Sequence, residues 1–338
     1  MGGRRVILVG DAIEQLATLP SGCVRCCVTS PPYWGLRDYG HPGQIGLEET
    51  LGEYVEKMVE VFRAVRRVLA DDGTLWLNLG DSYVASPNSG TGWDTSTLTK
   101  ANGRPRQIQL AQRASMRGGR DFGALRPKNV LGVPWRVAFA LQDDGWYLRS
   151  DIIWAKPNPM PESVRDRPTK SHEYLFLLSK ASRYFYDGDA IREPQSSKGC
   201  PSTADMPKGD NQERSMRRLG VGRGPRSCVT ENGKNARSVW TIATTPYPEA
   251  HFATFPIELP ARCIKAGSAE GDTVLDPFLG SGTTAAAAAM LGRDWIGCEL
   301  NPEYAALARA MIGRAAMGTA FRDESKEAEA PLFSEAAK

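Results

Sequence analysis

The sequence has few of the residues that build metal centres or disulfide frameworks. Its 338 residues include only three histidines, and no HExxH pattern occurs among them. The seven cysteines are an odd number, and the CxxCC group at 23–27 lacks the second pair that a zinc site needs. These absences argue against a metal enzyme and against a secreted disulfide scaffold. They favour reduced, buried thiols in a cytosolic protein.

Long apolar runs are also missing, so we expect no membrane span. The N-terminal stretch MGGRRVILVGD has a twin arginine, but VILV is too short for a signal peptide and Asp11 ends it. The composition, with 41% hydrophobic and 24% charged residues, is ordinary for a globular protein. The length allows one large α/β domain with insertions, or two domains.

Charge is unevenly distributed, although the formal net charge is only +3. Residues 84–128 carry eight Lys or Arg against two acids, and residues 191–237 carry ten against five. Two basic segments on a near-neutral body indicate a polyanionic partner, with solvated loops as the alternative. Residues 323–338 are acidic and are typical of a solvated tail.

Predicted strands and helices alternate along the chain. Strands are expected at RRVILVGD, VRCCVTS, TLWLNLGD, WYLRSDIIWAKP, EYLFLLSKA, TVLDPF and DWIGCEL. Helices are expected at AIEQLATL, 50–70, PWRVAFALQDDG, TTAAAAAMLGR and PEYAALARAMIG, with DDG ending the second of these. This order predicts an α/β fold with a doubly wound, mostly parallel sheet.

The segment DTVLDPFLGSGTTAAAAAMLGRDWIGCEL carries a cofactor signal. Gly280 and Gly282 lie between a strand and an alanine-rich helix, where backbone can approach a ligand. Glu299 ends the next strand, 17 residues after Gly282, where a carboxylate can accept hydrogen bonds from two ribose hydroxyls. The pattern predicts a nucleoside-binding βαβ unit.

The same glycine spacing also satisfies the dinucleotide fingerprint GxGxxG/A. Against that alternative, Asp276 places a carboxylate where a pyrophosphate would lie, whereas a cationic sulfonium ligand suits it. Asp11 ends another strand, and two roles stay open for it. It could bind an adenine amine, or it could cap the helix that follows.

The stretch TSPPYW, after the second predicted strand, is the other unusual feature. Proline cannot pair within a central strand, so Pro31 and Pro32 must begin a rigid loop at the strand end. TSPPYW followed downstream by DPFLGSGTT resembles the amino-group DNA methyltransferases of the β class, which use S-adenosylmethionine. Residues 151–180, 250–264 and GCELNPEYAALA are similar to further blocks of that family, so the resemblance covers about two-thirds of the chain.

The resemblance implies a Rossmann-like fold in permuted order, with inserted loops and a small target-recognition segment. Its implied cofactor residues are Asp11, Ser30, Phe255, Asp276, Pro277, Phe278, Gly280, Gly282, Thr283, Thr284, Glu299 and Asn301. The implied methyl-acceptor residues are Ser30, Pro31, Pro32 and Tyr33, with Asp81 as a further partner for the base or its amine. A helix or turn cap is the alternative role for Asp81, and a structural role or a phosphate contact for His172-Glu173.

The chemistry accounts for the loop. An exocyclic base amine is a weak nucleophile, so it must be held in line with the methyl group by acceptors that draw on its protons. The Ser30 hydroxyl and the proline carbonyls can accept these hydrogen bonds, and Tyr33 can stack on a flipped base. In the family, serine before Pro-Pro implies cytosine N4, with adenine N6 as the alternative. Cytosine C5 chemistry is disfavoured because the chain has no Pro-Cys dipeptide.

Sequence recognition needs a second surface that presents basic and amide side chains to a DNA groove. The expected organisation is a catalytic half at 1–83, a basic insertion at 84–128, the remaining catalytic core at 129–190, a target-recognition region at 191–237, a cofactor half at 238–318 and a flexible tail at 319–338. Candidate DNA contacts are Arg37, Arg214, Arg217, Arg218, Arg223 and Arg226.

The predicted protein is thus a cytoplasmic, site-specific methyltransferase of bacterial, archaeal or phage origin. Its partners would be S-adenosylmethionine and double-stranded DNA, and the sequence leaves open a cognate restriction endonuclease and a monomeric or homodimeric state. Two rivals remain: a nicotinamide-dependent oxidoreductase, which leaves the Pro-Pro loop unexplained, and a non-catalytic DNA-binding protein of the same fold.

Overall fold

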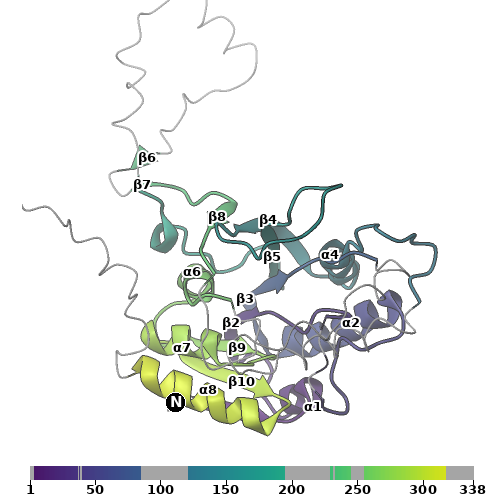
Figure 1. The fold of residues 1–338 in the computed structure, drawn as a ribbon. Coiled ribbons are helices and arrows are strands. Elements are labelled where there is room, and N and C mark those ends of the chain that lie inside the picture. The colour runs from purple at the N-terminus through teal and green to yellow at the C-terminus, as the bar shows by residue number, and fades with distance from the viewer. Residues whose placement is uncertain are drawn as a thin grey trace, which may run out of the picture.

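An eight-stranded sheet organises the part of the chain that the structure describes (Figure 1). The computed structural model describes residues 4–36, 38, 40–84, 121–194, 229–230, 233–244 and 255–316. The strand order is β1-β10-β9-β2-β3-β5-β4-β8. The strands are β1 (Arg5–Val9), β2 (Val24–Thr29), β3 (Leu69–Leu79), β4 (Tyr147–Ala155), β5 (His172–Ser179), β8 (Val239–Thr241), β9 (Thr273–Asp276) and β10 (Asp294–Glu299), while β6 (Val229–Thr230) and β7 (Gly233–Lys234) form a separate pair.

Most neighbouring strands in the sheet are parallel, as the sequence predicts. The exception is β5, which runs antiparallel to both β3 and β4. It follows β4 through the loop at 156–171 and returns beside it without a crossover helix. The remaining pairs described in this sheet are parallel, from β1·β10 at one edge to β4·β8 at the other. The prediction of a doubly wound, mostly parallel sheet is confirmed.

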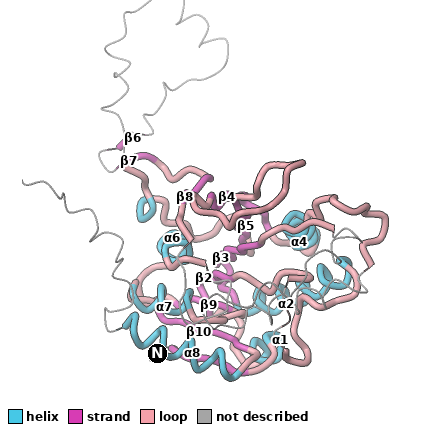
Figure 2. Tube along the Cα trace, in the orientation of Figure 1, coloured by secondary structure: helices cyan, strands magenta, loops and turns pink. Residues whose placement is uncertain are grey.

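Helices cover both faces of the sheet, which is seen nearly edge-on in Figure 2. One face carries α1 (Ala12–Ala17), α2 (Leu51–Val68) and α4 (Val133–Asp143), whose side chains join one buried cluster. The other carries α6 (Glu258–Gly267), α7 (Thr283–Met290) and α8 (Pro302–Ala316), which form a second cluster. A short 3₁₀ helix spans Asp189–Ile191. None of the helices in the described part of the chain could span a bilayer.

Helix α2, the longest among the described residues, shows how its sequence specifies it. Thr50 and Glu53 form a reciprocal capping box at its start. Its buried residues recur at helical spacing and pack against the sheet, as the sequence predicts. They are Tyr54, Met58, Val61, Phe62, Val65 and Val68.

The DDG sequence at 71–73 does not separate α2 from β3, contrary to expectation. β3 begins at Leu69, directly after α2, and its register against β2 shifts between Val24 and Cys26. This irregularity accommodates the extra residues while the strand continues. Gly73 is required there, since an added Cβ would lie 2.9 Å from the Arg25 carbonyl oxygen. The sequence also did not indicate α6.

Candidate functional site

A cleft opens between β9 and β2, where the connections that leave two neighbouring strands pass to opposite faces of the sheet. β9 and β2 are parallel neighbours, and their carboxyl ends lie side by side. From β9 the chain passes through α7 on one face, and from β2 it passes through α2 on the other. Such a switch point is where open α/β sheets bind ligands.

The cleft brings together most of the predicted cofactor and methyl-acceptor residues, from segments far apart in the chain. Of the predicted site residues, those lining it are Asp11, Ser30, Pro32, Phe255, Asp276, Pro277, Phe278, Gly280, Thr283, Glu299 and Asn301. The two predicted groups, the Pro-Pro loop and the glycine loop, therefore share one cavity.

Glu299 stands at the end of β10 and organises the loops around it. Its Oε2 accepts a hydrogen bond from Gly280 N at 2.8 Å, and its Oε1 accepts one from Asn301 N at 2.9 Å. Only 9% of the residue is exposed, and burial raises the pKa of its carboxyl. Each oxygen keeps a second lone pair, so the side chain can still accept hydrogen bonds from a ligand in the cleft.

Asp276 ends β9 as a buried carboxyl. Its Oδ1 accepts hydrogen bonds from Thr29 Oγ1 at 2.7 Å and from Phe278 N at 3.0 Å. Burial raises the pKa of Asp276 to about 6. A carboxylate in this position favours a cationic ligand over an anionic one, because a positive charge would offset its desolvation.

Of the two roles that the sequence left open for Asp11, the structure shows the helix cap. Its Oδ1 accepts hydrogen bonds from Ile13 N at 2.9 Å and Glu14 N at 3.1 Å, so it caps α1. The same residue lines the cleft. Capping holds the carboxylate at the mouth of the β1–α1 turn, and an adenine contact stays a prediction.

The two loop glycines differ in function. Gly280 lines the cleft with φ +53°, and an added Cβ would find no atom closer than 3.9 Å. Gly282 lies outside the cleft lining; its φ is +87°, and a Cβ would come within 3.0 Å of the Ala308 Cβ on α8. Thr284 is also outside the lining and donates to the Val28 carbonyl at 3.3 Å. Gly282 and Thr284 thus have packing roles in the structure, and their predicted contacts with a ligand stay predictions.

A hydrogen bond from helix α2 supports the Pro-Pro loop. Pro31 is buried, and Tyr54 Oη on α2 donates a hydrogen bond to the Pro32 carbonyl at 2.9 Å. This bond occupies one lone pair of the Pro32 carbonyl, and a contact of either proline carbonyl with the target amine stays a prediction. Gly46 supports the same loop, since a Cβ there would lie 3.2 Å from the Tyr33 carbonyl oxygen.

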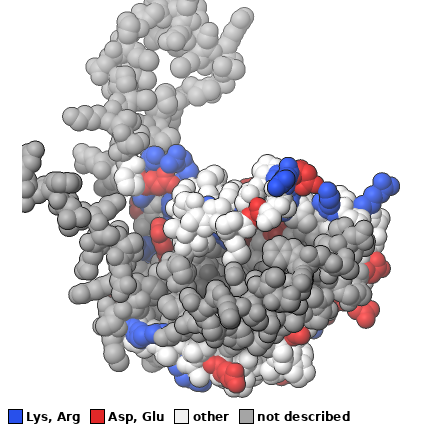
Figure 3. Space-filling view, viewed as in Figure 1, with Lys and Arg blue, Asp and Glu red and all other residues white. Residues whose placement is uncertain are grey.

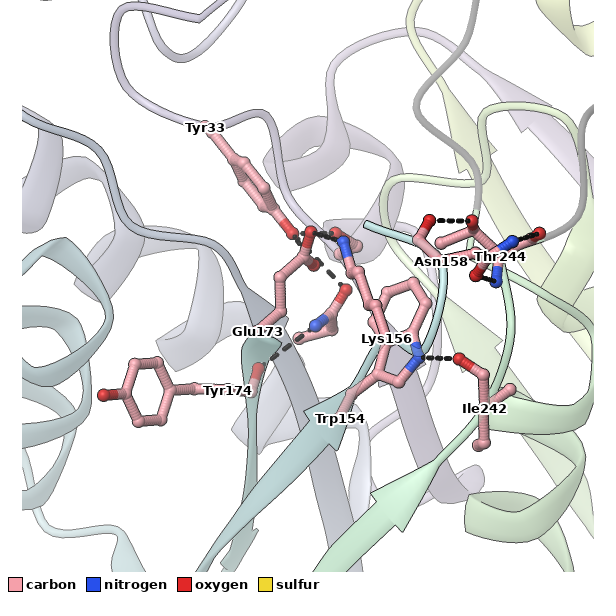
Figure 4. Close-up of polar contacts among 10 residues, drawn as sticks. Tyr33, Trp154, Lys156, Asn158, Glu173, Tyr174, Ile242 and Thr244 are labelled. Carbon is pink, nitrogen blue, oxygen red and sulfur yellow. Dashed lines mark hydrogen bonds and ion pairs between the residues drawn. The ribbon is translucent and has the colours of Figure 1, made fainter. Parts of the chain in front are cut away.

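Tyr33 is held at its hydroxyl, as Figure 4 shows. Its Oη donates to Glu173 Oε2 at 2.7 Å, and burial followed by the Glu173 charge raises the pKa of Tyr33 well above its usual value. The ring packs on Gly80, where an added Cβ would lie 2.6 Å from Tyr33 Cε2. Stacking of a base on Tyr33 stays a prediction.

Asp81 does not line the cleft. Its Oδ1 accepts from Ser82 N at 2.9 Å and from Val133 N, the first residue of α4, at 3.2 Å. Since Gly132 supplies no side-chain cap to α4, Asp81 provides one from the end of β3. The structure thus supports the capping alternative for Asp81 over a contact with the base.

Some residues of the site were not predicted. The loop at 41–45 and Tyr304 on α8 also line the cleft, and Glu173 contacts the Pro-Pro loop from β5. The glycines and proline that follow TSPPYW in the sequence could have indicated the loop at 41–45. Of the predicted DNA contacts, Arg37 and the arginines between 214 and 226 lie outside the described residues.

The fold and cleft define a nucleoside-binding α/β protein with a rigid Pro-Pro loop beside the ligand site. Residues 24–310 match the family model described as DNA methylase. The chain belongs to this DNA methylase family, and the resemblance seen in the sequence is confirmed.

Three known proteins are similar to the chain. It is 49% identical over 308 residues to the Type II methyltransferase M.SmaI of Serratia marcescens, covering 91% of this chain and 90% of that protein. TTHA0409 of Thermus thermophilus, solved in complex with S-adenosyl-L-methionine, is 26% identical with a TM-score of 0.54, covering 93% of this chain and 97% of that one. PvuII DNA methyltransferase (cytosine-N4-specific) shares the fold with a TM-score of 0.58 at 18% identity, covering 94% of each chain.

Proposed function

We propose that this protein methylates the N4 amine of a flipped cytosine within a specific sequence of duplex DNA, with S-adenosylmethionine as methyl donor. One observation carries the proposal. Ser30 and Pro32 of the Pro-Pro loop line the same cleft as Asp276, Gly280 and Glu299. An acceptor site for an amine and a site for a nucleoside donor are thus adjacent.

The residues present fit S-adenosylmethionine. Glu299 can accept hydrogen bonds from ribose hydroxyls, and Asp276 offers a buried carboxylate to a cation. Phe255 and Phe278 add apolar surface to the cleft. When bound, the cofactor supplies a methyl group activated by a sulfonium charge. The relative TTHA0409, which was solved with this molecule, supports the assignment.

The chain's own contribution to the reaction is positioning and hydrogen bonding. Ser30 Oγ and the Pro31 carbonyl accept hydrogen bonds from the target amine and direct its nitrogen toward the donor site. Pro31 and Pro32 fix their backbone angles, and Tyr54 fixes the Pro32 carbonyl, so the acceptors are preorganised. The amine nitrogen would form a bond to the methyl carbon as the methyl–sulfur bond breaks. The sulfur would keep that electron pair as a neutral thioether, and the amine would lose one proton to water.

Cytosine is favoured over adenine because the residue before Pro-Pro is serine. The cytosine-N4 specificity that PvuII DNA methyltransferase bears in its name agrees with this choice, although that enzyme is similar to this chain in fold alone. Adenine N6 is the alternative, with the same fold, cofactor and mechanism.

DNA would approach across the open edge of the cleft. On the face shown in Figure 3, Lys and Arg side chains lie in separate groups along the upper edge of the described surface, with Asp and Glu side chains beside them. We propose the basic segment at 191–237 as the sequence reader and the 84–128 segment as a second clamp. The Type II name of M.SmaI supports a cognate restriction endonuclease as a cellular partner, and a cytoplasmic location follows from that role.

Glu299→Ala should weaken cofactor binding by about 10- to 100-fold, because it removes the acceptor for two hydroxyls and frees the Gly280 and Asn301 amides. Isothermal titration with S-adenosylmethionine measures the dissociation constant. Glu60→Gln on the exposed side of α2 is the matched control. An unchanged dissociation constant in Glu299→Ala would remove Glu299 from the cofactor site.

A transfer assay tests the function itself. Purified protein is incubated with methyl-labelled S-adenosylmethionine and DNA of mixed sequence, and label in the recovered DNA is counted. We expect incorporation that saturates at a fixed number of sites per DNA length. A parallel titration with NAD separates the oxidoreductase alternative, which predicts NAD binding and no labelled DNA.

A further inference from the structure

Two side chains of the Pro-Pro loop and one from β5 form a continuous series of hydrogen bonds that ends at the cleft. Ser30 Oγ lies 3.3 Å from Tyr33 Oη, and Tyr33 Oη lies 2.7 Å from Glu173 Oε2. Ser30 lines the cleft, whereas Glu173 comes from β5, 140 residues from Tyr33 in sequence. We call these residues the Ser30–Tyr33–Glu173 chain.

Glu173, at the end away from the cleft, is held as a hydrogen-bond acceptor. The Lys156 ammonium contacts Glu173 Oε1 and also lies 4.2 Å from the centre of the Trp154 ring (Figure 4). Glu173 Oε1 is thereby engaged by a cation, and Oε2 is directed to Tyr33. A carboxylate has no hydrogen to donate, so the Tyr33 hydroxyl must be the donor in this contact.

Asn78 provides a second acceptor for the Tyr33 hydroxyl. Its Nδ2 donates to the Tyr174 carbonyl at 3.1 Å, which turns its Oδ1 toward Tyr33 Oη at 3.4 Å. Both of these neighbours of the tyrosine hydroxyl are therefore acceptors. The raised pKa of Tyr33 keeps the phenol protonated, so it remains a donor at physiological pH.

The direction in which these hydrogen bonds are donated then fixes the orientation of the Ser30 hydroxyl. With the Tyr33 hydrogen committed to Glu173 or Asn78, only a lone pair of Tyr33 Oη faces Ser30. Ser30 must donate its hydrogen to that lone pair, and its own lone pairs are left for the cleft. A serine hydroxyl is otherwise able to donate or to accept, and a hydroxyl that donated to the amine nitrogen would occupy the lone pair needed for attack on the methyl group.

We propose that Glu173 is a positioning residue for methyl transfer: acting through Tyr33, it sets Ser30 Oγ as an obligate acceptor for the target amine. The assignment rests on the proposed function, since it needs an amine substrate, but it applies equally to cytosine N4 and adenine N6. It also gives the Tyr33 hydroxyl a role separate from ring stacking.

The test is a double-mutant cycle of Glu173→Gln and Tyr33→Phe. Glutamine keeps the size of Glu173 but can donate to Tyr33 Oη, which would reverse the donor–acceptor direction of these hydrogen bonds. Phenylalanine keeps the ring of Tyr33 and removes the hydroxyl that joins Ser30 to Glu173. For each protein, kcat, KM for DNA, the cofactor dissociation constant and Tm are measured. Tyr184→Phe, which loses only a hydroxyl that contacts Arg149, is the matched control.

We expect each single variant to lower kcat by about 10- to 100-fold, as for loss of a hydrogen bond to a charged group, with the cofactor dissociation constant changed less than about threefold. The double variant should be no worse than the poorer single variant, because Glu173 acts only through Tyr33. A merely structural Glu173 would instead give additive losses and a similar loss of cofactor affinity.

An unchanged kcat in Glu173→Gln, or additive losses in the double variant, would overturn the assignment. If Glu173→Gln does not fold, Tyr33→Phe decides alone, and wild-type kcat in that variant overturns the assignment. A wild-type protein that methylates DNA while the variants are unaffected contradicts only the role of Glu173. A wild-type protein that transfers no methyl group contradicts the proposed function and this assignment together.

Discussion

Replacing Ser30 by alanine should lower kcat for methyl transfer by about 100- to 1,000-fold, the usual effect of losing one preorganised partner at a reacting group. Ser30 Oγ is the side-chain acceptor nearest the target amine in the proposed mechanism, and alanine leaves only the Pro31 carbonyl. The cofactor dissociation constant should change less than about threefold, because Asp276, Gly280 and Glu299 remain in place.

Single-turnover rates and cofactor titrations on the same preparations separate these two quantities. Ser182→Ala, at an exposed serine in the turn after β5, is the matched control and should behave as wild type. Equal losses of kcat and of cofactor affinity in Ser30→Ala would show that the serine shapes the donor site, contrary to the mechanism.

Asp276→Asn should stabilise the unliganded protein and at the same time weaken cofactor binding by about 10- to 100-fold. The folded pKa of Asp276 is about 6, above its ordinary value of 3.8. Between these values the native state binds more protons than the unfolded state, so stability falls as pH rises from about 4 to about 6 and stays lower above that range. Asparagine removes this cost, which is about 2–3 kcal/mol for the shift cited.

Two measurements check the opposed effects. Denaturant unfolding without cofactor is measured between about pH 4.5 and about pH 8, roughly two units to either side of the Asp276 pKa. The free energy of unfolding should fall through about pH 6 in the wild type. It should change less with pH in Asp276→Asn. Cofactor affinity of the wild type should rise as Asp276 ionises. A variant that binds the cofactor as tightly as wild type would exclude a charge contact between Asp276 and the ligand.

Much of the site could be predicted from sequence because the residues stand at strand ends. Asp276 and Glu299 each end a strand, and Ser30 and Asp11 closely follow one. Parallel strands in one sheet bring their carboxyl ends to the same edge, so strand-end residues distant in sequence meet there. The alternation of strands and helices predicted the sheet, and the family resemblance assigned these residues to one site.

Contacts that depend on side-chain direction were beyond the sequence. Glu173 reaches Tyr33 only because β5 is inserted antiparallel between β3 and β4, which the alternating pattern does not reveal. Tyr54 was expected only as part of an apolar helix stripe, yet its hydroxyl braces Pro32. Asp81 follows a strand like the others, but it caps α4 because the Gly132 at that helix start supplies no side chain.

The identity of the methylated nucleoside tests the central claim most directly. DNA methylated by the purified protein with labelled S-adenosylmethionine is digested to nucleosides, and the labelled product is identified by mass spectrometry against standards. The account predicts N4-methylcytosine as the labelled product. N6-methyladenine would contradict the assignment of the base from Ser30, and 5-methylcytosine would contradict the amine mechanism altogether.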